Sequence, residues 1–205
     1  MSELQIFFMM LLPLLIIMDP WGNLPLFLSL TRNNSQAERR RMAAVACVAS
    51  AVILSLFALS GDVVLRFFQI SIPAFQIAGG LIFFIYALQL LALIPIGIKG
   101  SAEEEEEGIR KENIALVPLA TPLLAGPGAI TAVLVWRQQG DSLWEHGQLY
   151  LVILVACAVV YGILYFADNL RRLLGVSGIR VITRLTGLLL AVIAVQFIVN
   201  GWQQL

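Results

Sequence analysis

Six long apolar segments dominate this chain of 205 residues and restrict what it can fold into. A helix of roughly 20 apolar residues crosses a bilayer core about 30 Å thick. Because 60% of the residues are hydrophobic and only 13% are charged, against about 25% in ordinary soluble domains, these segments cannot all be buried in a water-soluble core. The segments cover residues 5–30, 42–65, 73–95, 114–136, 149–168 and 179–201. The sequence therefore predicts an all-α membrane protein, with six transmembrane helices in a single membrane domain (residues 1–205).

The Lys and Arg residues are distributed unevenly among the connections between these segments. Eleven of the 13 lie on the first, third and fifth connections: Arg32, Arg39, Arg40, Arg41, Lys99, Arg110, Lys111, Arg171, Arg172, Arg180 and Arg184. Since basic residues are retained on the cytoplasmic side, we expect both termini to be external and residues 96–113 to form a cytoplasmic acidic loop. The acidic run at 103–107 is interpreted as a solvated loop in preference to a cation-binding tract. No basic patch indicates nucleic-acid binding.

The two halves of the chain are related by a fixed sequence shift. A shift of 107 positions pairs Pro20 with Pro127, Gly80 with Gly187 and Gln89 with Gln196 without gaps. Each half would hold three spans, an odd number, so the second half must enter the membrane from the opposite side. We therefore expect two inverted repeats, residues 5–95 and 114–202, as in many secondary transporters.

The first apolar segment has two prolines near its middle. Its 26 residues would form a helix of about 39 Å, which is too long for a straight, untilted crossing. Proline lacks a backbone N–H and clashes with the preceding turn, so Pro20 and Pro25 cannot both lie in an undisturbed helix. Asp followed by Pro is typical of an N-cap and a first helical position. We expect a new half-helix to begin at Asp19.

The fourth segment repeats this pattern, with Gly126 as the expected N-cap and Pro127 as the first helical residue. In inverted repeats the two half-helices would run outward from the bilayer midplane, with their N-termini facing each other. Unpaired N–H groups and the helix dipole make such a site suitable for a carboxylate. The alternative is that these prolines and glycines only kink helices and allow close packing.

We expect the substrate-binding residues to lie at the two breaks: Asp19, Pro20, Gly22, Asn23, Pro25, Thr121, Gly126, Pro127 and Gly128. The amides of Gln76, Gln89 and Gln196 could line a path or bond between helices. Cys47 and Cys157 are expected to be packing residues, and His146 a solvated loop residue. No catalytic group, metal site or cofactor is predicted.

Four motifs together resemble the MarC family of bacterial and archaeal integral membrane proteins. Two are long and specific, Asp19 to Phe27 (DPWGNLPLF) and Pro118 to Ile130 (PLATPLLAGPGAI), and two are short, residues 78–80 (AGG) and 184–188 (RLTGL). The likeness covers nearly the whole chain. It implies a protein of the plasma (inner) membrane in the LysE-like transporter group, some of whose members are described as neutral amino-acid transporters.

The sequence thus favours a secondary transporter of a small zwitterion, such as a neutral amino acid, by alternating access of two repeats. Asp19 and Asn23 would hold the ammonium group or a coupling cation, a proton or sodium ion, and the helix starts would hold the carboxylate. Without a nucleotide-binding motif, direct drive by ATP is not expected. A passive channel, an intramembrane enzyme and a non-transporting membrane partner or regulator are the alternatives. A homo-oligomer is left open.

Overall fold

The computed structural model describes residues 3–67, 69–94, 115–139 and 143–205, and all regular structure within them is helical. The elements are α1 (Glu3–Met18), α2 (Pro20–Leu30), α3 (Gln36–Phe67), α4 (Ile72–Leu90), the π-helical η1 (Ala115–Leu124), α6 (Pro127–Gln139), α7 (Leu143–Tyr165) and α8 (Ala167–Trp202). The predicted acidic loop at 96–113 lies outside the described residues.

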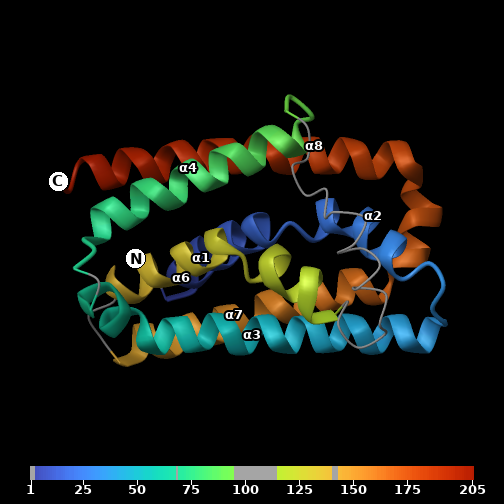
Figure 1. The fold of residues 1–205 in the computed structure, drawn as a ribbon, viewed down its shortest axis with the longest axis horizontal. Helices are drawn as coiled ribbons and strands as arrows, with labels where there is room; N and C mark the ends of the chain where they lie inside the picture. The colour runs from blue at the N-terminus through green and yellow to red at the C-terminus, as the bar shows by residue number, and fades with distance from the viewer. Residues whose placement is uncertain (1–2, 68, 95–114, 140–142) are drawn as a thin grey trace.

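The helices form three layers (Figure 1). Helices α4 and α8 lie side by side in one outer layer, and α3 and α7 pair in the other. The short helices of the two breaks fill the middle layer, where α1 and η1 contact the α3/α7 pair, and α2 and α6 contact α8 and α4 respectively. The polar breaks are therefore shielded on both sides by long apolar helices.

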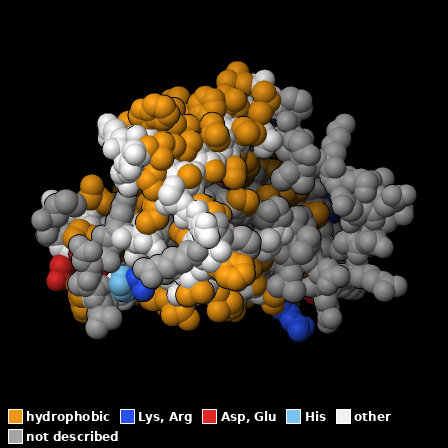
Figure 2. Space-filling model, turned by 60° about the vertical axis from the view of Figure 1, so that its left-hand side comes forward, with side chains coloured by type: hydrophobic (Ala, Val, Ile, Leu, Met, Phe, Trp, Pro, Cys, Tyr) orange, Lys and Arg blue, Asp and Glu red, His pale blue; other side chains and the backbone are white. Residues whose placement is uncertain are grey.

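The outer surface carries large apolar side chains. On α3, Val48, Val52, Leu56 and Leu59 recur at helical spacing and are 52–70% exposed, while Ala46 on the opposite face is fully buried. Figure 2 shows apolar side chains over much of one face, with the coloured charged groups near its margins. Exposed apolar stripes of this extent are stable in lipid and not in water, so the surface matches a bilayer.

Five helical stretches of the described chain are long and apolar enough to cross a membrane: Glu3–Leu30, Gln36–Gly61, Ile72–Leu90, Trp144–Tyr165 and Ala167–Trp202. The predicted fourth span, residues 114–136, is divided between η1 and α6, which have 10 and 13 residues. Neither is long enough alone, since a crossing needs roughly 20 residues.

In this part of the chain one feature was not predicted from the sequence, and one expectation was wrong. The fifth connection is helical, because α8 begins at Ala167, directly after α7, and bends at Gly175 (φ 64°, ψ 177°). His146 is not a loop residue: it lies in the first turns of α7, half-buried, and contacts the Arg137 side chain. A Lys- or Arg-rich stretch can thus be helical where it meets the membrane surface.

Glycines set the close approach of α4 and α8. A Cβ at Gly80 would lie 2.8 Å from the carbonyl oxygen of Ala194, and a Cβ at Gly187 would lie 3.3 Å from the carbonyl oxygen of Ala87. Backbone atoms cannot move aside as a flexible side chain can, so an added methyl group would push the helices apart. Small residues at such contacts are the usual basis of helix association in membranes.

We predict that Gly80→Ala lowers the free energy of unfolding by about 1–3 kcal/mol, the range for overpacking a tight contact. Gly162→Ala is the matched control, because a Cβ at Gly162 meets nothing within 4 Å. Thermal unfolding of the purified protein in detergent measures both. Equal stabilities of the two variants would contradict a close α4–α8 contact at Gly80.

Candidate functional site

The break in the first span lies at Asp19, as the sequence predicted. Asp19 has a left-handed backbone (φ 41°, ψ 64°) and is the N-cap of α2, which begins at Pro20. Its Oδ1 accepts a hydrogen bond of 3.1 Å from the Gly22 N–H. The carboxylate thus satisfies one of the N–H groups that a helix start leaves without a partner.

Asn23 satisfies the other side of the same break. Its Nδ2 donates a hydrogen bond of 2.9 Å to the carbonyl oxygen of Met18, the last residue of α1. Asn23 is only 2% exposed and Met18 is fully buried, so water does not replace this bond. Asp19 and Asn23 together cap the two helix ends that meet here.

The second carboxylate oxygen of Asp19 is not used by the cap. Asp19 is fully buried, and its Oδ2 has no hydrogen-bond partner in the described part of the protein. A Cβ at Gly22 would collide with this oxygen, so the carboxylate lies directly over the glycine. Tyr86 of α4 lies beside the same carboxylate. The unpartnered oxygen could take up a proton or bind a cation.

The second break shares its helix start with the first, although the helix before it is the π-helical η1 and not an α-helix. Helix α6 begins at Pro127, and the Ile130 N–H donates to the Gly126 carbonyl at 3.0 Å, just as the Asn23 N–H donates to the Asp19 carbonyl at 3.1 Å. Figure 1 shows α2 and α6 leaving the middle of the molecule in opposite directions. The predicted helix starts at Pro20 and Pro127 are therefore confirmed.

Helix α4 contacts both helix starts. Its Leu90 lies near Gly22, and the ring of Phe83 occupies the place that a Cβ at Gly128 would need. Seven residues of helix separate these contacts, which corresponds to about 10 Å. Phe83 is 2% exposed and packs edge-to-face on Phe197 with ring centroids 5.3 Å apart. Phe83 thus covers the α6 backbone at Gly128, whereas Pro127 at the start of α6 is exposed.

The remaining predicted residues are spread over the molecule. Pro25 and Thr121 are exposed, and Gln196 is exposed and donates to Asn200 on its own helix at 2.6 Å. Gln76 is 1% exposed, and its Oε1 has no hydrogen-bond partner among the described residues, but it lies ten residues, or about 15 Å, from Tyr86 along α4. Gln89 is half-buried. The breaks therefore hold only part of the predicted set.

Sequence reasoning missed the contribution of α4. Tyr86 and Phe83 were not singled out, although a hydroxyl group in an otherwise apolar span is a visible signal. Which break they face depends on the register of α4 against the middle layer, and that register is set by contacts far away in the sequence.

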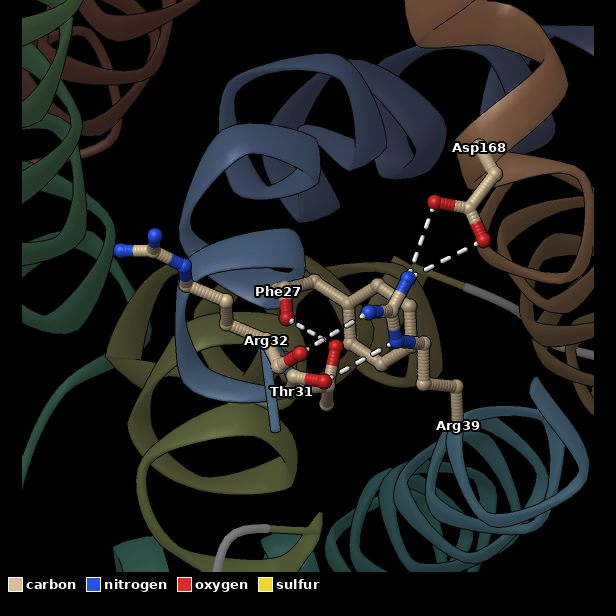
Figure 3. A network of polar contacts seen from close by, with 5 residues as sticks. All are labelled: Phe27, Thr31, Arg32, Arg39 and Asp168. Atoms are coloured by element: carbon tan, nitrogen blue, oxygen red, sulfur yellow. Dashed lines mark hydrogen bonds and ion pairs between the residues drawn. The ribbon is translucent and has the colours of Figure 1, made fainter. Parts of the chain in front are cut away.

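A polar network ties the elements together at one end of the molecule (Figure 3). Arg39 of α3 forms an ion pair with Asp168 of α8 at 2.9 Å and donates to the backbone carbonyls of Thr31 and Arg32. Elsewhere, Arg137 at the end of α6 donates to the Ala58 carbonyl of α3 at 3.1 Å. In each case an arginine holds the outer end of a half-helix against a neighbouring helix.

Comparison with known proteins identifies the family of the chain. The sequence profile of MarC family integral membrane proteins matches residues 4–205. The chain belongs to the MarC family. A membrane protein of the UPF0056 group from Aquifex aeolicus is 41% identical over 194 residues, covering 95% of this chain and 91% of its own. YhcE from Escherichia coli, also a UPF0056 membrane protein, is 34% identical over 97% of this chain and 93% of its own.

This MarC family protein also has relatives in archaea. A UPF0056 membrane protein from Methanocaldococcus jannaschii is 37% identical over 205 residues, covering 97% of both chains. No solved structure matches the chain. The chain is therefore an integral membrane protein of a family found in bacteria and archaea.

We predict that the cap at Asp19 depends on an acceptor atom and not on charge. Asp19→Ala should lower the free energy of unfolding by about 0.5–2 kcal/mol, and Asp19→Asn by much less, because Asn caps nearly as well as Asp.

Gly22→Ala should strongly destabilise the original protein, since its Cβ collides with the Asp19 carboxylate. The same substitution should destabilise the Asp19→Ala variant less, because that carboxylate is then absent. Thermal unfolding of the four variants measures this; additive effects would contradict the contact.

Proposed function

We propose that this MarC family protein is a secondary transporter of a small zwitterion, of which a neutral amino acid is the best-fitting class. The observation that carries the proposal is the buried Asp19 carboxylate with one unpartnered oxygen. A carboxylate at the bilayer centre costs roughly 2.5–3.5 kcal/mol on insertion scales. Capping alone needs one acceptor, which Asn would supply. The second oxygen is available to a coupling ion, a proton or sodium ion, or to an ammonium group.

The helix starts provide the complementary half of a zwitterion site. Both helix starts lie in the middle layer, and the partial positive charge of a helix start favours a carboxylate. At α2 the Gly22 N–H already donates to Asp19, so the carboxylate of the zwitterion is assigned to the start of α6. Gly128 lets a ligand approach the α6 backbone closely once Phe83 moves away, because it has no side chain of its own. In the proposed cycle, α4 therefore moves relative to α6 when substrate binds.

The contacts between α4 and α8 support two inverted repeats, each with one broken span, and hence six spans in all. Gly80 faces Ala194, and Gly187 faces Ala87. At the shift of 107, Gly80 corresponds to Gly187 and Ala87 corresponds to Ala194. Each contact is therefore the counterpart of the other, as across a two-fold axis. Residue numbers rise along α4 while they fall along α8, which makes the helices antiparallel.

A two-fold axis that relates two antiparallel helices is perpendicular to them. For helices that cross a membrane, this axis lies in the membrane plane, the relation expected for inverted repeats. The middle layer follows the same exchange: α1 contacts α7 as η1 contacts α3, and α2 contacts α8 as α6 contacts α4. Two halves related in this way would provide the basis for alternating access to a site between them.

We predict that Asp19→Asn abolishes transport or removes its dependence on pH and sodium, while the protein still folds. The test is uptake of a panel of neutral amino acids by purified protein in liposomes, with and without ion gradients. Asp168→Asn is the matched control, because it makes the same chemical change in a residue that lies 36% exposed in the Arg39 network. Uptake by Asp19→Asn with normal rate and normal ion dependence would reduce Asp19 to a cap.

The distribution of Lys and Arg supports an orientation in the plasma membrane with both termini external and residues 96–113 cytoplasmic. We predict that Ser2→Cys reacts with an impermeant thiol reagent added to intact cells and that Glu105→Cys does not. The native Cys47 and Cys157 are each only 4% exposed and should give little background. Labelling in the opposite pattern would reverse the orientation.

A further inference from the structure

A groove of about 520 Å³ lies between the C-terminal half of α2 and the first third of α8. Arg32, Arg171 and Ser29 line its polar part, and Leu28, Val176 and Ile179 are among its apolar lining residues. Pro25, a residue predicted to belong to the first break, also lines it, but neither Asp19 nor Gly128 does. The groove therefore belongs to the outer part of the molecule.

The two arginines of the groove have no counter-charge in the part of the chain that the structure describes. No hydrogen bond or ion pair of either guanidinium is found there, and Asp168, three residues before Arg171, is engaged by Arg39. Figure 3 shows the Arg32 guanidinium pointing away from that network. Two unpaired cations lining one groove create a local positive potential that favours an anion.

The bend of α8 gives the groove its mixed lining. Gly175, at φ 64° and ψ 177°, lies between Arg171 on one side and Val176 and Ile179 on the other. This backbone conformation is essentially restricted to glycine, and a Cβ there would meet no neighbouring atom, so conformation and not space requires the glycine. The bend thus places charged and apolar residues in succession along one wall.

We propose that this groove binds an anionic phospholipid, with its phosphate on Arg32 and Arg171 and an acyl chain along Leu28, Val176 and Ile179. Free phosphate would use the arginines but leave the apolar wall uncovered. Val176 is 63% exposed, as expected of a residue that faces lipid. Basic pockets between transmembrane helices are known to hold anionic lipid head groups.

The test is native mass spectrometry of the delipidated, full-length protein in non-ionic detergent, titrated with phosphatidylglycerol or phosphatidylcholine. Phosphatidylglycerol, which is anionic, should bind more tightly than the zwitterionic phosphatidylcholine. Arg32→Gln or Arg171→Gln should each weaken its binding about fivefold, and the double variant about thirtyfold. The control is Arg172→Gln with Arg184→Gln, which removes the same charge from exposed residues outside the groove and should leave affinity unchanged.

Several outcomes would overturn the proposal. Equal binding by the Arg32→Gln/Arg171→Gln variant and the original protein would do so, as would an equal loss in the control pair, which would indicate general attraction to a basic surface. Glycerol 3-phosphate that competes as effectively as the lipid would assign the arginines to a soluble phosphate. Circular dichroism and thermal unfolding establish that each variant is folded, and the two single variants supply the comparison if the double variant is not.

Discussion

Inside a bilayer, every backbone N–H and C=O must find a partner within the protein, and this requirement shapes the centre of the molecule. A break in a spanning helix creates unpaired groups on both sides. At the first break the chain solves this locally: Asp19 accepts from the start of α2, and Asn23 donates to the end of α1. Pro20 contributes as well, because it has no N–H that would need a partner.

Helix α4 connects this local solution to the rest of the fold. One face meets α8 through Gly80, and its buried Phe83 and half-buried Tyr86 reach the two breaks. A change in the α4–α8 contact therefore displaces the α4 side chains at the two breaks, because close-packed interiors transmit displacement. The surroundings of the Asp19 carboxylate consequently depend on how α4 packs against α8.

The sequence could predict the breaks, since Asp-Pro and Gly-Pro act through local backbone chemistry that does not depend on the rest of the chain. It could not predict the bend of α8. Both Gly175 and Gly178 follow the basic stretch, and only Gly175 takes the backbone conformation that requires glycine. It could not predict the positions of Tyr86 and Phe83 either, because these depend on how α4 lies against the middle layer. That register is fixed by contacts between distant parts of the sequence, such as Phe83 with Gly128 and Leu90 with Gly22.

The two breaks lie at equivalent sequence positions but differ in charge. At the shift of 107, Gly126 takes the place of Asp19, and Ile130 takes the place of Asn23. One break therefore presents a carboxylate, whereas the other presents only the backbone N–H groups of a helix start. A dipolar ligand held between them has a defined direction, with its positive end toward Asp19 and its negative end toward α6. In the proposed transport function, a zwitterion would therefore be bound in one sense and not in the reverse.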